Sequence, residues 1–172
     1  LYSHMGQGLV SDVFSNSKIF ENLRGNYAIG HTRYSTTGEN NATNVGPLQF
    51  NLDDSFVSIA HNGNLVNLLK TRKKLQKNGA IFQTTTDTEI IIHLLARKTE
   101  ATLTERIAST LKEIEGAFSI IIISKEGLHI ARDPQGIRPL CFGKLDDTII
   151  IASETCALDL LGAQSVSYTH LR

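Results

Sequence analysis

Residues 59–67, Ile-Ala-His-Asn-Gly-Asn-Leu-Val-Asn, contain the polar groups needed to hold an anionic reaction intermediate. The side-chain NH₂ of Asn62 offers two donors, and the backbone N–H of Gly63 follows it directly. Two such donors aimed at one point can stabilise a developing oxyanion. The same residues also suit an ordinary Asn-Gly turn in which Asn64 or Asn67 caps a following helix. This segment alone leaves both interpretations open.

The stretches on either side of residues 61–64 predict how such a turn would be held. Residues 56–59 are apolar and are typical of a short strand, whereas residues 67–78 predict a helix that ends at Gly79. Gly63 would allow a positive φ and a close approach to the backbone. We therefore expect a polar turn between a strand and a helix.

A second polar group, residues 84–89, reads Thr-Thr-Thr-Asp-Thr-Glu and precedes an apolar run. Thr86 and Glu89 have the spacing of a capping box, which predicts the start of a helix. Asp87 would lie in its first turn, where the helix dipole favours a carboxylate. A contact between Asp87 and a ligand is the alternative.

Residues 38–47 are rich in Gly, Asn, Thr and Pro and follow a strand-like stretch, residues 27–34. Long loops in this position often act as lids over a site. A disordered connection is the alternative interpretation.

The composition predicts one globular domain with a sizeable core, since the chain has 172 residues, of which 41% are hydrophobic and 20% charged. Lys+Arg and Asp+Glu both number 17, so the net charge gives no reason to expect a nucleic acid or membrane partner. Cys141 and Cys156 lack metal-ligand or redox spacing, which fits a reducing compartment, and no signal peptide is visible. The six histidines have no ligand spacing either, so we expect a cytoplasmic protein without a metal site in this chain.

Helices are expected in pairs and strands as hairpins, which predicts an α+β fold with largely antiparallel sheets. Thr102 and Glu105 form another capping box, and the helix they open ends at Gly116. The expected hairpins pair residues 117–124 with 128–132 and residues 140–143 with 148–152, and a short helix covers 156–161.

Six motifs, in order along residues 6–166, together resemble the glutaminase domain of the amidophosphoribosyltransferases, the class II glutamine amidotransferases that open purine synthesis. They are Gly-Leu-Val at 8–10 with Val-Phe at 13–14, Gly-His-Thr-Arg-Tyr-Ser-Thr-Thr-Gly at 30–38, Ala-His-Asn-Gly-Asn-Leu at 60–65, Thr-Asp-Thr-Glu at 86–89, Arg-Asp-Pro-Gln-Gly-Ile-Arg-Pro-Leu at 132–140, and Ser-Glu-Thr with Ala-Leu at 153–158.

The resemblance implies an N-terminal-nucleophile fold, a four-layer αββα sandwich of two mainly antiparallel sheets, incomplete here at its N-terminus. It implies that Arg33 grips the α-carboxylate of glutamine, a role suited to a bidentate guanidinium. Asp87 would receive the α-ammonium group, and Asn62 with Gly63 would form the oxyanion hole. The functional interpretation of residues 59–67 is then the favoured one.

The resemblance also assigns the loop that begins at Thr37 and Gly38 and ends at Pro47. This loop looks like the lid that closes over glutamine and excludes water. Residues 133–140 are better assigned to the fold and to contacts with neighbouring domains than to chemistry.

One departure from the family concerns the nucleophile, a cysteine at the mature N-terminus whose α-amine is its base. This chain has Leu1 there, and Cys156, within a helix, is expected to be a small core residue. We expect residues 1–5 and 167–172 to be foreign or misread flanks of a partial domain, residues 6–166, that is inactive alone.

The resemblance implies partners and cofactors outside this sequence. The phosphoribosyltransferase domain would follow at the C-terminal side with its Mg²⁺ site, and some intact members carry an iron–sulfur cluster. No cofactor is expected in this fragment itself, and the intact protein would be a homo-oligomer. Residues 34–38 and 133–140 favour the purine enzyme over glucosamine-6-phosphate or asparagine synthases; a non-catalytic glutamine-binding module is the alternative of a different class.

Overall fold

The computed structural model describes residues 1–33, 42–53 and 55–168, with only the backbone for the last two. Thr37 and Gly38 of the expected lid therefore lie outside the described residues. The helices are α1 Val10–Val13, α2 Lys18–Asn22, the 3₁₀ helix η1 Ala42–Asn44, α3 Leu68–Lys77, α4 Thr88–Leu95, α5 Leu103–Leu111 and α6 Thr155–Leu161. The strands are β1 Leu48–Leu52, β2 Ser55–Leu65, β3 Gly116–Ser124, β4 Gly127–Arg132, β5 Cys141–Leu145, β6 Thr148–Ala152 and β7 Gln164–Tyr168.

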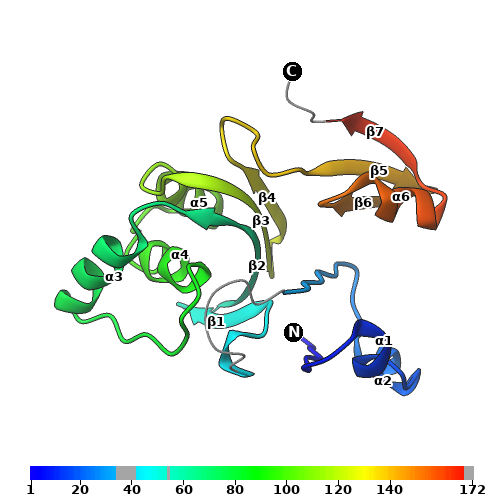
Figure 1. Ribbon diagram of the computed structural model, residues 1–172, viewed down its shortest axis with the longest axis horizontal. Coiled ribbons are helices and arrows are strands. Elements are labelled where there is room, and N and C mark those ends of the chain that lie inside the picture. Colours follow the sequence, from blue (N-terminus) through cyan, green and yellow to red (C-terminus); the bar gives the residue numbers. More distant parts are fainter. Residues whose placement is uncertain (34–41, 54, 169–172) are drawn as a thin grey trace.

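The first sheet has the strand order β1-β2-β3-β4, and every neighbouring pair is antiparallel. Its long central pair, β2 and β3, is separated in sequence by the three helices α3, α4 and α5. These helices lie on one face of the sheet (Figure 1). The core between them and the sheet is aliphatic except for one phenylalanine, and its buried members include Val57, Ile59, Leu65, Ile91, Leu95, Leu103, Ile107, Phe118, Ile120 and Ile122.

The second sheet has the order β6-β5-β7, again antiparallel, and α6 packs on it. It lies on the other side of the first sheet from α3 and α4 (Figure 1). The two parts meet where Ser119 of β3 donates to the carbonyl of Pro139, at 3.1 Å, just before β5. None of the helices among the described residues is long and apolar enough to cross a bilayer.

The α+β class and the two antiparallel sheets are confirmed, as are α3, α5 and both predicted hairpins. The turn predicted at residues 61–64 is wrong, because β2 continues through them and stays in register with β3 as far as Leu65, opposite Gly116. Residues 27–33 are not a strand, and no pairing in the described sheets includes them. No local pattern predicted β7, which pairs with β5 and includes Ser167 and Tyr168.

Two further expectations about single residues are wrong. Asn67, one of the two possible caps, precedes α3 in a left-handed conformation, φ 60°, without capping the helix through its side chain. Cys156 is exposed on α6, so it is not a core residue, whereas Cys141 is buried in β5.

The two predicted capping boxes have different outcomes. Thr102 is extended and accepts from Glu105 N, and the Glu105 carboxylate accepts from Thr102 N, so this box is confirmed. The box of Thr86 and Glu89 is wrong: α4 begins two residues later, at Thr88, and the Glu89 carboxylate bonds to residues 83 and 84 instead.

Candidate active site

The alternation of β2 sorts the residues of the predicted oxyanion segment onto two faces of the sheet. Val57 and Ile59 face the helices, and so do His61 and Gly63. Asn62 faces the opposite way, and its side-chain NH₂ donates to Ser153 Oγ, 3.2 Å away, between β6 and α6. The amide therefore lies on the side of the second sheet.

The hydrogen-bond ladder decides where the backbone N–H of Gly63 points. Val66 N donates to Glu115 O, so by antiparallel alternation the even-numbered residues of β2 exchange bonds with β3. The N–H and C=O groups of His61, Gly63 and Leu65 then point to the other edge. Since β1 pairs with β2 only as far as Ile59, this edge is free of β1 at Gly63.

Gly63 is required by close packing and not by an unusual backbone conformation. A Cβ built on it would lie 2.3 Å from the carbonyl oxygen of Ala117 and 2.5 Å from His61 Nε2. Its φ is not among the positive values of the described glycines, so of the two freedoms that a glycine offers here only the close approach of another backbone is used. The absence of a side chain keeps β3 and the His61 ring against this part of β2.

Asp87, the last residue before α4, reaches the same edge of β2. Its Oδ2 accepts from the backbone N–H of Leu65 at 3.3 Å, and its Oδ1 lies 3.3 Å from His61 Nδ1. His61 Nδ1 also lies 3.3 Å from Thr88 Oγ1. The Asp87 carboxylate therefore binds β2 at Leu65, two residues after Gly63.

The surroundings of Asp87 keep its carboxylate ionised. Burial acts to raise its pKa, but the hydrogen bond and charge of His61 and the Leu65 N–H act in the other direction, and the net pKa lies below its usual value. Asp87 therefore remains negative at neutral pH, as a site for an ammonium group requires.

His31 brings the segment that carries Arg33 to this edge. His31 Nε2 donates to the backbone carbonyl of His61 at 3.1 Å, and its ring packs so closely on Gly46 that a Cβ there would lie 2.6 Å from Nδ1. The pKa of His31 lies below its usual value. Burial lowers it most, and the charges of His61 and Arg33 lower it further, whereas the hydrogen bond to the His61 carbonyl acts to raise it. Arg33 itself is exposed.

The structure thus brings Asp87 and the segment of Arg33 to the open edge of β2 beside Gly63, while the Asn62 side chain projects from one face of the same strand. Direct contacts among Arg33, Asp87 and Asn62 are not seen in the described residues.

Pro47, the last residue of the expected lid loop, directly precedes β1. A hollow lined by Asp53, Ser55 and Arg106 lies at the opposite end of β2 and does not mark this site.

The motif-based hypothesis gave no role to two histidines of this site, although both lie within the motifs. The rings of His31 and His61 are mostly buried, and the ring nitrogens His31 Nδ1 and His61 Nε2 have no partner among the described residues. Their position beside an Arg and an Asn-Gly pair was the available signal. In the described residues, no group of three or more His, Cys, Asp or Glu is arranged to hold a metal ion.

Comparison with known proteins identifies the family of this domain. Residues 31–160 match the family model of the glutamine amidotransferase domain. The chain belongs to this family. The match includes His31, Asn62 and Asp87, so it covers all three segments that meet at the edge of β2.

Curated relatives of this amidotransferase domain are amidophosphoribosyltransferases. The protein from Rhizobium etli is 44% identical over 96% of the chain and 33% of the relative, and that from Bacillus subtilis is 42% identical over 95% and 34%. A chloroplastic relative from Arabidopsis thaliana is 45% identical over 92% of the chain and 28% of its own length. The chain therefore spans about a third of the length of these relatives.

Two solved structures show the same fold. One is described as the allosteric regulatory enzyme of purine biosynthesis and has a TM-score of 0.90, with 40% identity over 96% of the chain and 36% of that structure. The other is glutamine phosphoribosylpyrophosphate amidotransferase from B. subtilis in complex with ADP and GMP, with a TM-score of 0.88, 40% identity, and coverage of 96% and 35%. The N-terminal-nucleophile type of fold expected from the motifs is thereby confirmed.

Proposed function

We propose that this domain binds glutamine at the open edge of β2 and releases ammonia from it within a longer amidophosphoribosyltransferase. The observation that carries the proposal is the half-buried, ionised carboxylate of Asp87, which binds the free edge of β2 two residues from Gly63. A negative group and a backbone N–H side by side suit the two ends of the reacting amino acid: its α-ammonium group and the oxyanion formed from its side-chain amide.

Each predicted residue has a role in this reaction. Arg33 holds the α-carboxylate through two parallel hydrogen bonds, and Asp87 receives the α-ammonium group. A cysteine thiolate supplied from outside this sequence attacks the carboxamide carbon, and the resulting oxyanion accepts from Asn62 Nδ2 and Gly63 N. The α-amine of that cysteine, which took the thiol proton, returns it to the amide nitrogen as the C–N bond breaks and ammonia leaves; water then hydrolyses the thioester to glutamate and frees the thiol.

The Asn62 amide is already oriented in this structure. Its bond to Ser153 fixes the NH₂ group, and one of its two donors stays available for the oxyanion. Thr37, Gly38 and Pro47 belong to the loop that we propose as the lid over bound glutamine. His61 fixes the orientation of Asp87, and His31 ties the Arg33 segment to the strand.

The activity of the whole protein extends beyond this domain. We propose that the ammonia displaces pyrophosphate from phosphoribosyl pyrophosphate in a linked, Mg²⁺-dependent phosphoribosyltransferase domain and gives 5-phosphoribosylamine. The intact protein would be a cytoplasmic homo-oligomer, and an iron–sulfur cluster, where present, would use cysteines outside this sequence. The share of each relative that the chain covers, about a third, supports a further domain of this kind.

The test is glutaminase turnover of the full-length protein as a function of glutamine concentration. Asp87→Asn should raise KM for glutamine, because a neutral amide loses the charge that binds the ammonium group. Arg33→Lys should also raise KM, because an ammonium group cannot form the two-pronged carboxylate contact. Unchanged KM values in both variants would remove these residues from the site, and glutamine binding without turnover in the wild-type protein would favour a non-catalytic binding module.

A further inference from the structure

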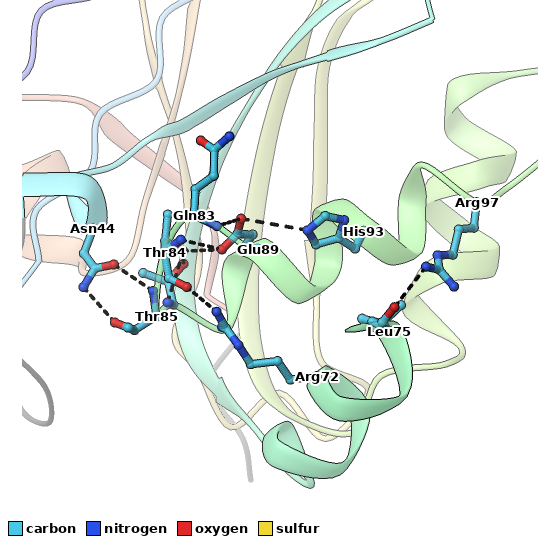
Figure 2. Close-up of polar contacts among 10 residues, drawn as sticks. Asn44, Arg72, Leu75, Gln83, Thr84, Thr85, Glu89, His93 and Arg97 are labelled. Atoms are coloured by element: carbon cyan, nitrogen blue, oxygen red, sulfur yellow. Dashed lines mark hydrogen bonds and ion pairs between the residues drawn. The ribbon is translucent and has the colours of Figure 1, made fainter. Parts of the chain in front are cut away.

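The three residues before Thr86 are held by contacts from three separate elements, α4, α3 and η1 (Figure 2). This clamp comprises Glu89 of α4, Arg72 of α3 and Asn44 of η1, which bind the backbone or side chains of residues 83–85. Asp87 follows only two residues later. A segment without regular structure is thereby fixed directly next to the proposed ammonium site.

Glu89 is the centre of the clamp. Its Oε1 accepts from Gln83 N at 2.7 Å, and its Oε2 accepts from Thr84 N and Thr84 Oγ1, both at 2.8 Å. The residue is only 7% exposed. A carboxylate accepts hydrogen bonds without donating any, so three donors converging on two oxygens match Glu and do not match Gln.

The hydroxyl of Thr84 links Glu89 to Thr86, the residue before Asp87. Its proton is donated to Glu89, so its lone pairs accept from Thr86 N at 3.2 Å and from the Thr86 hydroxyl at 2.9 Å. All hydrogen-bonding positions of the Thr84 hydroxyl are therefore used. The residue next to Asp87 is thus hydrogen-bonded to a group that Glu89 orients.

Arg72 and Asn44 hold the same segment from the other sides. Arg72 donates to the carbonyl of Thr84 at 2.6 Å while its guanidinium lies 4.0 Å from the ring centre of Phe82. Asn44, 3% exposed, accepts from Thr85 N at 3.1 Å and donates to Thr85 Oγ1 at 2.9 Å. The backbone of Thr84 and Thr85 is then bound on both its N–H and C=O sides.

We propose that Glu89, acting through the Thr84 hydroxyl, is a positioning residue that sets the place of the Asp87 carboxylate relative to the edge of β2. The inference rests on the proposed role of Asp87 in glutamine binding. It assigns to a buried glutamate a function in substrate affinity in addition to its part in the fold. Neither Glu89 nor Thr84 touches the substrate.

The test is glutaminase kinetics of the full-length protein with a matched pair of variants at Thr84. Thr84→Val keeps the shape of the side chain and removes the hydroxyl, whereas Thr84→Ser keeps the hydroxyl. We expect Thr84→Val to raise KM for glutamine roughly tenfold with kcat within about twofold, because a small displacement of a binding group weakens binding steeply. Thr84→Ser should behave like the wild type, and Glu89→Gln should follow Thr84→Val.

A double-variant comparison separates positioning from a loss of fold. Asp87→Asn removes the carboxylate that the clamp positions, so adding Glu89→Gln to it should raise KM by less than about twofold further. Arg97→Ala is the matched structural control. Arg97 follows α4 and donates to the carbonyl of Leu75 (Figure 2) and to that of Asn78, so it ties the end of α4 to the end of α3, away from residues 83–87. Its loss should leave KM unchanged.

Three outcomes would overturn the positioning role. These are equal KM values for Thr84→Val and Thr84→Ser, a fall in kcat at unchanged KM in both Thr84→Val and Glu89→Gln, and fully additive effects of Glu89→Gln and Asp87→Asn. If Asp87→Asn itself leaves KM unchanged, the proposed glutamine site fails, and the positioning role fails with it. If Asp87→Asn raises KM while the clamp variants do not, only the positioning role is lost.

Discussion

Gly63→Ala tests the close packing of β2 against β3, and its cost follows from the geometry. The added Cβ would lie 2.3 Å from Ala117 O and 2.8 Å from Phe118 Cα, and both are backbone atoms of β3. Ordinary contact begins near 3.4 Å, so the strands would have to move apart by about 1 Å. A flexible side chain can turn away from such a contact, but a paired strand cannot.

The magnitude combines two effects. Forcing an extra carbon into a packed site costs about 1–3 kcal/mol, and each ladder hydrogen bond lost contributes about 1 kcal/mol. The bonds at risk belong to the pairs Asn62–Ser119 and Asn64–Ala117 on either side of Gly63. We therefore expect a loss of about 3–5 kcal/mol, which is a large part of the stability of a typical domain and lowers the midpoint of unfolding by about 10 °C.

The assay is thermal unfolding of the full-length protein together with amide hydrogen exchange, read by mass spectrometry on peptides from β2 and β3. Gly63→Ala should lower the unfolding midpoint and speed exchange in these peptides. Gly30→Ala is the control: a Cβ there meets nothing within 4 Å, and its φ is not positive, so the change should stay within about 0.5 kcal/mol. An unfolding midpoint and exchange rates in Gly63→Ala that match the wild type would refute the packing argument.

Three further predictions concern other parts of the domain. Burial acts to raise the pKa of Asp133, but hydrogen bonds from three backbone N–H groups outweigh burial, so its pKa in the folded protein lies below the usual 3.8. The ionised carboxylate therefore stabilises the fold above pH 3.8, and this stabilisation is lost as the pH falls through the pKa of the folded state. Asp133→Asn should therefore cost about 2–3 kcal/mol at neutral pH and weaken the acid dependence of urea unfolding, and an unchanged acid dependence would contradict this. Thr102→Ala should cost about 1 kcal/mol by removing the capping box of α5, whereas Thr102→Ser should not, as measured by urea unfolding. Under native conditions a thiol reagent should modify Cys156, which is exposed, and spare Cys141, which is buried and whose pKa burial raises; equal labelling of the two, read by mass spectrometry, would contradict the structure.

The two capping boxes show how far local sequence predicts this fold. Thr102 with Glu105 and Thr86 with Glu89 have the same spacing, yet only the first forms. The Glu89 carboxylate is engaged by the N–H groups of residues 83 and 84, and the helix begins after Asp87. Spacing alone did not separate the two cases, because the competing donors belong to a segment that α3 and η1 fix from outside.

The prediction at residues 61–64 failed for a related reason. An Asn-Gly pair between apolar stretches is a strong local turn signal, but here the pair lies inside an eleven-residue strand. The partner that keeps it extended is β3, which follows about fifty residues later in the sequence. A glycine in a strand often marks close approach of another backbone, and Gly63 is such a case.

The strand found in place of the predicted turn explains the direction of the Gly63 N–H. In a turn, the N–H of Gly63 would take a direction set by local backbone angles, whereas in β2 the ladder with β3 fixes it towards the open edge. Asp87 and His31 reach that edge from opposite directions in sequence, and both bind backbone groups of the strand, Asp87 together with the buried ring of His61. The resemblance in sequence grouped Asp87 with Asn62 and Gly63, and the strand register explains how the Asp87 carboxylate comes to bind β2 two residues from Gly63.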